Sequence, residues 1–223
     1  MKTLPYYMYP CALVAFILFA SVGNTILAQE MVKQTELDEK VITFLDSKTG
    51  KWRDLNVPVS DGKLLYELIV KKGYTKALEI GTSTGHSTIW IAWALSKTGG
   101  KLITIEIDES RYKEALDNLK KAGLSDFVDA RLANAHDLVK ELPGPFDFVF
   151  SDADKGWYVN YFKDIAPKLI AGGCFTAHNV RPAGKGRSGM TGTRQYLEYV
   201  QGLKNYTTTV NNSGGGLAIS YKN

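Results

Sequence analysis

The sequence predicts a doubly wound α/β fold, in which a mostly parallel, seven-stranded sheet is covered by helices on both faces. From residue 76 onward, short apolar runs alternate with amphipathic segments of helix length, and runs this short are typical of strands. Such alternation favours parallel strands, because their crossover helices bury both faces of the sheet. Two strand-like runs joined by Ser-Gly-Gly-Gly then predict a closing antiparallel hairpin. With 223 residues, of which 44% are hydrophobic and 22% charged, we expect one domain.

The expected elements follow in order along the chain. Two amphipathic helices come first, over residues 36–48 and 60–73, and the second has Ser60 as candidate N-cap and Gly73 as its stop. The five strands of the parallel part are expected over residues 76–80, 101–107, 127–132, 146–152 and 172–178. The helices that follow these strands are expected over residues 86–97, 109–123, 135–142, 156–170 and 192–203. The hairpin strands are expected over residues 206–212 and 216–222.

Residues 1–28 form an N-terminal segment of a different kind. One early lysine precedes an apolar block over residues 11–22, and small and polar residues follow. This layout predicts a secretory signal peptide with cleavage near Ala28. The alternative is an uncleaved membrane anchor, since residues 6–23 nearly reach the length that spans a bilayer. Either interpretation places the domain over residues 29–223 outside the cytoplasm, as a secreted, periplasmic or membrane-anchored protein.

Composition narrows the classes of partner. The net charge of +4 is spread over mixed lysines and acids rather than gathered in a basic stripe. No module of interleaved aromatic and basic residues is found, which argues against a nucleic-acid partner. The two cysteines, Cys11 and Cys174, do not form a disulfide framework. We therefore expect a small-molecule partner, and a membrane contact only through the N-terminal segment.

The first strand of the sheet ends in a glycine-containing turn, Glu-Ile-Gly-Thr-Ser-Thr-Gly-His-Ser, over residues 79–87. Ligands of an open parallel sheet bind beyond the carboxyl ends of the strands. Glycines let the backbone approach a ligand closely, and a helix N-terminus offers free N–H groups to an anionic group. The spacing is Gly-x-x-x-Gly rather than the Gly-x-Gly-x-x-Gly of a dinucleotide site, which counts against NAD. A plain strand-to-helix turn explains the glycines alone about equally well.

The ends of the next two strands carry residues that suit a nucleoside. Glu106 follows the second strand, where a carboxylate can accept hydrogen bonds from two ribose hydroxyls. Asn134, Ala135 and His136 follow the third strand and can frame an aromatic base. An N-cap for the next helix explains this third segment nearly as well.

The fourth and fifth strands end in groups that suit a cation. Ser-Asp-Ala-Asp-Lys at residues 151–155 places two carboxylates near a lysine, which is costly to bury unless they are paired or bound to metal. Asp152 and Lys155 are spaced to meet at one site. The fifth strand ends at His178-Asn179 and is expected beside the fourth, although a left-handed turn alone also explains Asn179. Asp152, His178 and Asn179 together predict a divalent-cation site of oxygen and imidazole donors.

These stretches together resemble the cation-dependent O-methyltransferases of the catechol and caffeoyl-CoA type, which use S-adenosylmethionine (SAM). The resemblance runs from about Val57 to the C-terminus and rests on LEIGTSTGHST, TIEIDESRY, FDFVFSDADKGWY, GGCFTAHNV and the closing hairpin. It implies a Rossmann-like domain that transfers a methyl group from SAM to a hydroxyl of a small, catechol-like aromatic acceptor. A homodimer is compatible with it.

The resemblance also implies a SAM site, whose residues in this sequence are Glu79, Gly81, Ser87, Glu106, Ala135, His136 and Asp152. By position, Glu79 and Gly81 would lie against the methionyl end of SAM, and Ser87 would hold its carboxylate. The carboxylate of Glu106 would take the ribose, and the pair at residues 135–136 would border the adenine.

The implied chemistry depends on Lys155, which would take the proton from the acceptor hydroxyl, and on a metal held by Asp152, His178 and Asn179. Most members of the family have Asp-Asn where this chain has His178-Asn179. Losing a carboxylate weakens a Mg²⁺ or Ca²⁺ site and favours Mn²⁺, Fe²⁺ or Zn²⁺. Two alternatives stay open: His178 acts without a metal, as general base or by orienting the acceptor, or the protein only binds SAM. The hairpin turn also departs from the family, with Ser-Gly-Gly-Gly in place of an acidic turn.

Overall fold

The structure is a computed structural model that describes residues 31, 34–52, 54–182 and 191–223. The expected signal peptide or anchor at the N-terminus lies outside the described residues and stays a prediction. Within the described ranges, no helix is both long enough and apolar enough to cross a membrane.

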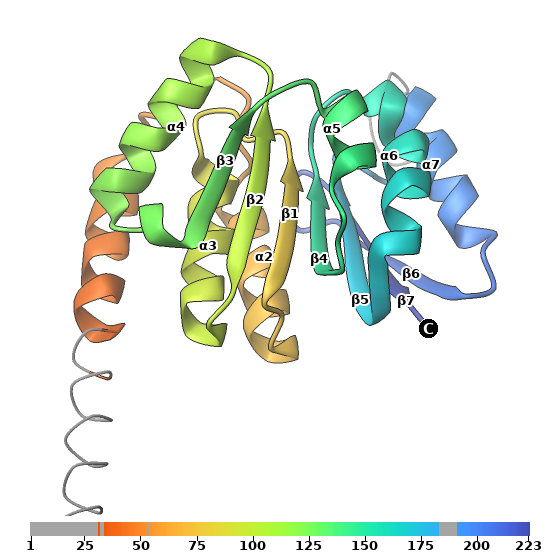
Figure 1. The fold of residues 1–223 in the computed structure, drawn as a ribbon, viewed down its shortest axis with the longest axis horizontal. Helices are drawn as coiled ribbons and strands as arrows, with labels where there is room; N and C mark the ends of the chain where they lie inside the picture. Colours follow the sequence, from red (N-terminus) through yellow and green to blue (C-terminus); the bar gives the residue numbers. More distant parts are fainter. Residues whose placement is uncertain (1–30, 32–33, 53, 183–190) are drawn as a thin grey trace, which may run out of the picture.

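A seven-stranded sheet in the order β3-β2-β1-β4-β5-β7-β6 forms the centre of the fold (Figure 1). Its strands are β1 (Lys76–Ile80), β2 (Lys101–Glu106), β3 (Val128–Leu132), β4 (Phe146–Ser151), β5 (Leu169–His178), β6 (Tyr206–Asn211) and β7 (Leu217–Lys222). Strands β1 to β5 pair in parallel, whereas β7 is antiparallel to both β5 and β6. The predicted fold class and the closing hairpin are therefore confirmed.

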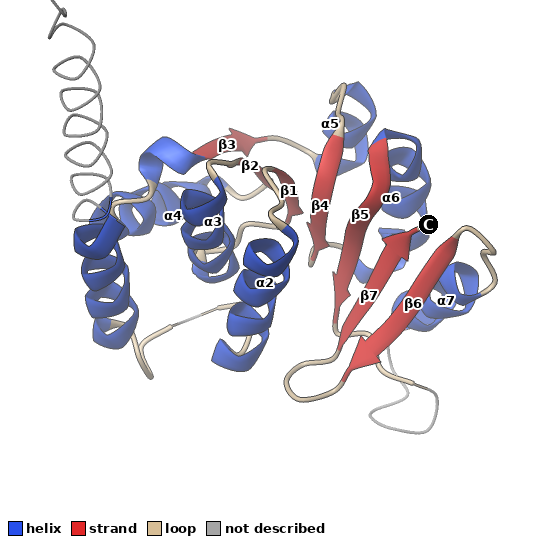
Figure 2. Ribbon diagram, turned by 90° about the horizontal axis from the view of Figure 1, so that it is seen from below, coloured by secondary structure: helices blue, strands red, loops and turns tan. Residues whose placement is uncertain are grey.

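Helices form a layer on each face of the sheet (Figure 2). They are a first helix over residues 34–47, then α2 (Val59–Lys72), α3 (His86–Thr98), α4 (Glu109–Ala122), α5 (Ala135–Glu141), α6 (Tyr158–Ile165) and α7 (Thr191–Gln201). One core lies between the sheet and α5, α6 and α7, and the opposite core lies between the sheet and α2 and α3. Neighbouring residues of β1, Ala77 and Leu78, belong to opposite cores, as the two-residue period of a strand requires.

Two expected details are wrong at helix ends. Ser60 does not cap α2, because the helix begins at Val59 after Pro58, whose φ of −58° already suits a helix start. The helix expected to run to residue 170 ends at Ile165, since a short 3₁₀ turn containing Pro167 separates it from β5. The expected stop at Gly73 is confirmed, with φ of 67° in the left-handed region that glycine adopts readily.

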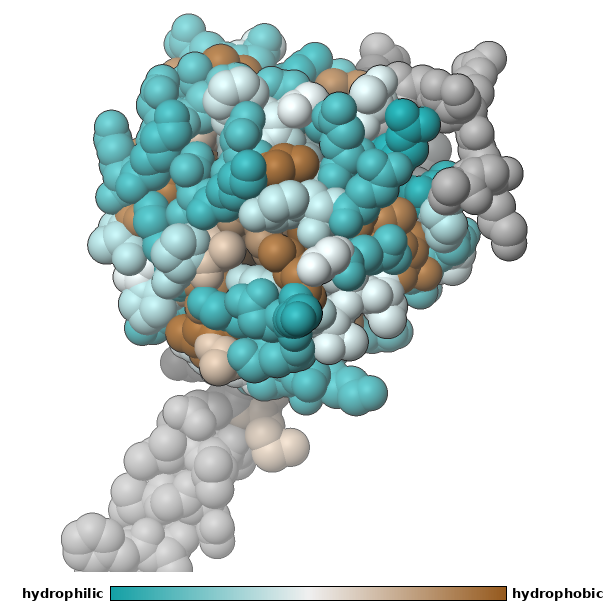
Figure 3. Space-filling model, turned by 90° about the vertical axis from the view of Figure 1, so that its right-hand side faces the viewer, coloured by the Kyte–Doolittle hydropathy of each residue, from teal (hydrophilic) through white to brown (hydrophobic). Residues whose placement is uncertain are grey.

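The face of the molecule shown in Figure 3 is mostly hydrophilic, with apolar residues scattered among polar ones. Scattered apolar residues are normal on a protein surface. This face therefore gives no support to the expected homodimer, which stays a prediction.

The contact between α2 and α3 depends on Gly62. A Cβ atom at this position would lie 2.3 Å from Cδ1 of Trp90, whose indole N–H donates to Nε2 of His86 at 3.1 Å. We predict that Gly62→Ala lowers the free energy of unfolding by about 1–3 kcal/mol, because the added methyl group overpacks this contact. Urea unfolding measures the change. Gly202→Ala is the control, because its methyl group would lie 3.4 Å from the nearest atom. Equal stability of the two variants would contradict the prediction.

Candidate functional site

A cavity of about 760 Å³ lies at the carboxyl ends of the central parallel strands, a volume usual for small-molecule sites. Of the residues that the sequence nominated, all but Glu79 line it: Gly81, Ser87, Glu106, Ala135, His136, Asp152, Lys155, His178 and Asn179. Parallel strands bring these positions to one edge of the sheet, although they are spread over about a hundred residues of chain.

The glycine turn after β1 forms part of the cavity wall. Gly81 has φ of 101°, and a Cβ atom there would lie 2.9 Å from the backbone nitrogen of Ala153. Its N–H donates to the carbonyl of Ile105 at 3.0 Å. Only glycine fits this position without strain, so the loops after β1 and β4 can approach each other closely.

Glu79 lies beneath the cavity rather than in its wall. Its carboxylate is fully buried and accepts hydrogen bonds from the hydroxyls of Ser87, Thr88 and Thr104, each at 2.6 Å. Burial raises the pKa of Glu79 to about 7, and the three hydroxyls offset part of this rise. Because the Ser87 hydroxyl donates to Glu79, it is not free to donate to a ligand carboxylate. The backbone N–H groups in the first turn of α3 are donors that the helix N-terminus offers to such a group.

Glu106 is buried at the end of β2 with its carboxylate fixed by the backbone. Oε2 accepts from the N–H of Ser83 at 2.7 Å, and Oε1 accepts from Ile107 and Asp108 at 3.0 and 2.9 Å. A carboxylate has about four acceptor positions. The three backbone donors thus leave about one position for a ligand hydroxyl.

The segment after β3 serves two purposes at once. Asn134 caps α5, since its side-chain oxygen accepts from the N–H of His136 at 2.9 Å. The ring of His136 stacks on Trp157, with centroids 4.2 Å apart, and its Nε2 lies 3.0 Å from Oδ2 of Asp154. The helix cap that explained this segment is confirmed, and Ala135 and His136 still line the cavity.

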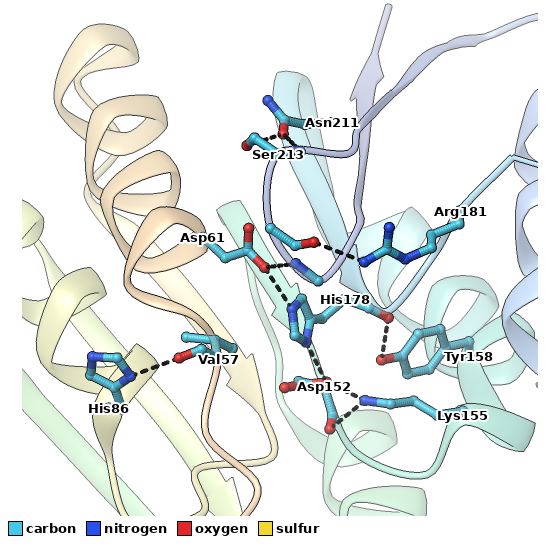
Figure 4. Close-up of polar contacts among 12 residues, drawn as sticks. Val57, Asp61, His86, Asp152, Lys155, Tyr158, His178, Arg181, Asn211 and Ser213 are labelled. Atoms are coloured by element: carbon cyan, nitrogen blue, oxygen red, sulfur yellow. Dashed lines mark hydrogen bonds and ion pairs between the residues drawn. The ribbon is translucent and has the colours of Figure 1, made fainter. Parts of the chain in front are cut away.

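His178 lies between two carboxylates (Figure 4). Its Nε2 is 2.8 Å from Oδ2 of Asp61, its Nδ1 is 3.2 Å from Oδ1 of Asp152, and the residue is 4% exposed. Carboxylates only accept hydrogen bonds, so both ring nitrogens donate and the ring is an imidazolium. Burial lowers the pKa of His178, but hydrogen bonds to Asp152 and Asp61 and their charges outweigh it and raise the pKa to about 9.

Lys155 is a second cation beside the Asp152 carboxylate. Its ammonium contacts Oδ1 of Asp152 and donates to the backbone carbonyl of the same residue at 2.9 Å. Asn179 follows with φ of 58°, the left-handed conformation that its side chain tolerates. The structure therefore brings together Asp152, Lys155, His178 and Asn179, as the sequence predicted.

Asp61 is a charged residue beside the cavity that the sequence did not predict as part of the site. It belongs to the first turn of α2, is 1% exposed, and accepts from the N–H of Gly215 at 2.7 Å as well as from His178. Its contact with His178 joins residues 117 positions apart. The available signal was its place in the stripe Asp61, Leu65, Ile69, because a charged residue four positions before buried apolar ones faces the core.

Sequence comparisons identify the relatives of this chain. A family model described as O-methyltransferase matches residues 28–207. A catechol O-methyltransferase from Niastella koreensis is 40% identical over 135 residues, which cover 59% of this chain and 61% of that protein. Caffeoyl-CoA O-methyltransferase 1 from Eucalyptus globulus is 32% identical over 127 residues, covering 55% of this chain and 51% of that protein. The matched segments thus span about half to three fifths of these relatives.

Solved structures share the fold over most of its length. An O-methyltransferase from Bacillus cereus in complex with SAH has a TM-score of 0.71 and 26% identity, covering 83% of this chain and 91% of that chain. The O-methyltransferase TomG from Streptomyces achromogenes, solved in complex with SAM, has a TM-score of 0.70 and 28% identity, covering 82% and 89%.

The ion pairs of His178 predict a pH-dependent stability. The folded state raises the pKa of His178 from 6.5 to about 9, so its stabilisation is complete below pH 6.5 and is lost as the pH rises through 9. The shift corresponds to at most about 3 kcal/mol. We predict that the protein loses this free energy of unfolding over that range and that His178→Gln does not. Urea unfolding at several pH values measures both proteins. Parallel pH profiles would contradict the assignment.

Proposed function

We propose that this chain, which belongs to the O-methyltransferase family, transfers a methyl group from SAM to a hydroxyl of a small aromatic acceptor such as a catechol. The observation that carries the proposal is the convergence of Lys155 and of the nominated SAM residues other than Glu79 on one cavity. Relatives named catechol and caffeoyl-CoA O-methyltransferase support an aromatic acceptor with neighbouring oxygens.

The cavity wall fits SAM in two respects. Glu106 keeps an acceptor position for a ribose hydroxyl beyond its three backbone bonds. The Ser83 hydroxyl is buried in the same wall, and among the described residues it has no hydrogen-bond partner. Buried hydroxyls usually bind a partner, so this one is available to the ligand. SAM supplies a methyl group activated on a sulfonium.

The side chains around Asp152 arrange the acceptor for transfer. Lys155 acts as the base that takes the hydroxyl proton of the acceptor. Bound SAM would give up its methyl group by an in-line displacement, in which the C–O bond forms as the C–S bond breaks, and the residues of the cavity would assist it mainly by positioning. His178 is not the base, because both of its ring nitrogens already donate to carboxylates, and its role is to hold the Asp152 carboxylate that pairs with Lys155.

The resemblance implied a cation at Asp152, His178 and Asn179, and the arrangement of these residues does not fit one. A metal needs a free lone pair on imidazole nitrogen, and both nitrogens of His178 donate to carboxylates. Over residues 34–52, 54–182 and 191–223, no group of three or more His, Cys, Asp or Glu is placed to hold a metal ion. We therefore propose transfer without a bound cation.

We predict that Lys155→Ala lowers kcat by about 10²- to 10⁴-fold, the usual contribution of a positioned proton acceptor. The dissociation constant of SAM should stay within about twofold, because Lys155 lies with the acceptor rather than the nucleoside. Labelled SAM and a panel of catechols measure transfer, and calorimetry measures binding. Retained turnover would remove Lys155 as the base. SAM binding without transfer to any acceptor by the unmodified protein would instead favour a protein that only binds SAM.

We also predict that EDTA leaves transfer unchanged in the unmodified protein, because the imidazolium supplies the positive charge of the site. His178→Asp should lose about tenfold or more of its activity in EDTA, since three carboxylates then lie beside Lys155 and the cluster carries an uncompensated negative charge. Added Mn²⁺ should restore part of it, because carboxylate and amide oxygens suit this ion. Loss of the unmodified protein's activity in EDTA, with recovery in Mn²⁺, would overturn cation-independent transfer.

A further inference from the structure

The turn of the β6–β7 hairpin is built to approach Asp61 and His178. A Cβ atom on Gly214 would lie 1.9 Å from Oδ1 of Asp61, and one on Gly215 would lie 2.4 Å from Nε2 of His178. Gly216 has φ of 93°, and its Cβ atom would lie 2.5 Å from the carbonyl oxygen of Val180. Each position therefore requires glycine, and the three together allow a contact that any side chain would prevent.

One oxygen of Asp61 joins three segments that are far apart in the sequence. Oδ2 accepts from the N–H of Gly215 at 2.7 Å and from Nε2 of His178 at 2.8 Å. Asp61 comes from α2 and His178 from the end of β5 (Figure 4), and Gly215 lies in the turn between β6 and β7. A carboxylate with two donors on one oxygen fixes the position of both.

The charges around Asp61 keep it ionised. Burial raises its pKa, but the hydrogen bonds from His178 and Gly215, with the charge of His178, outweigh burial and hold the pKa below its ordinary value. Arg181, which follows β5, places a cation beside the turn, where its guanidinium donates to the carbonyl of Gly214 at 2.8 Å. Asp61 and Asp152 are thus matched by His178 and Lys155, which is the condition for burying charges.

We infer that Asp61 is a positioning residue of the proposed methyl-transfer site, which acts by holding His178 and the hairpin turn. With Nε2 held, the ring must turn Nδ1 toward Asp152, and this in turn fixes the carboxylate that pairs with Lys155. Asp61 does not line the cavity itself, so its effect on an acceptor passes through His178. The inference rests on the proposed function, because it assigns Asp61 a part in that reaction.

The test compares Asp61→Ala with Asp61→Asn. Alanine removes the carboxylate that accepts hydrogen bonds from Gly215 and His178. The kcat should therefore fall roughly 10- to 100-fold, as expected for a misplaced reacting group, while SAM binding stays within about twofold. Asparagine keeps an oxygen that can accept from both Gly215 and His178, so it should recover most of this loss. A kcat of Asp61→Ala within about twofold of the unmodified protein, or SAM binding weakened in proportion to kcat, would overturn the inference.

Asp147→Asn is the matched control. Asp147 is also a buried carboxylate, accepting from the N–H groups of Thr75 and Lys76 at 2.6 and 2.9 Å, but it lies where β4 begins and not at the cavity. Its variant should lose stability and keep kcat. If Asp61→Ala does not fold, Gly215→Ala displaces the same turn without removing a charge, and it should lower kcat in the same way; an unchanged kcat there would also overturn the inference.

A second measurement separates this inference from the proposed function. Nitrogen-15 NMR should show slowly exchanging ring N–H signals of His178 in the unmodified protein and in Asp147→Asn, and their loss in Asp61→Ala. If the unmodified protein transfers no methyl group, the proposed function fails, and so does the catalytic part of the inference. The NMR signals then still decide whether Asp61 holds His178, and signals that persist in Asp61→Ala would refute that part too.

Discussion

The pairing of a buried imidazolium with one buried carboxylate, Asp61, and one partly exposed carboxylate, Asp152, is the interaction on which the arrangement of this site depends. A charged group removed from water is costly unless it is matched, so His178, Asp61 and Asp152 are stable inside the protein only together. These side chains come from β5, α2 and the loop after β4, which share no local contact in the sequence. The sheet supplies the frame, because its parallel strands end at one edge. The ion pairs of His178 then join α2 and the loop after β4 to the end of β5 at that edge.

This chain departs from the family it resembles in two features, the histidine at position 178 and the glycines of the hairpin turn. Each of these features depends on the other. The histidine ring reaches Asp61 because the hairpin turn passes it as bare backbone, with Gly215 beside Nε2. An acidic side chain in that turn would collide with the ring or with Asp61, and it would add a third negative charge. A histidine at position 178 thus requires small residues in the turn and a carboxylate on α2. The glycines of the turn and His178 therefore depend on each other, although Gly214 and His178 are 36 positions apart in the sequence.

Hydrophobic periodicity was sufficient to predict the strands and most helices, because each pattern acts over a few residues. The places of Asp152, Lys155 and His178 at or just after strand ends predicted that the three residues lie close together, since a parallel sheet brings the carboxyl ends of its strands to one edge. The helix periodicity indicated only that Asp61 faces the core, and its pairing with His178 could not be predicted, because the two residues are 117 positions apart. Glu79 was placed by its motif against a ligand. In the structure its carboxylate accepts hydrogen bonds from hydroxyls of α3 and β2 and lies beneath the cavity. These contacts join different elements, so they are seen only once the elements are packed.

The net charge of the site depends on which residue stands at position 178. Replacing an aspartate by a protonated histidine changes the charge at position 178 from −1 to +1, a difference of two, which equals the charge of a divalent cation. With Asp61 and Asp152 at −1 each and His178 and Lys155 at +1 each, the four groups sum to zero. A neutral cluster has little electrostatic attraction for a metal ion, whereas an aspartate in place of the imidazolium would leave a site of −2. In the proposed cation-independent site, the imidazolium of His178 therefore supplies positive charge from within the chain, and Asp61 holds it in place.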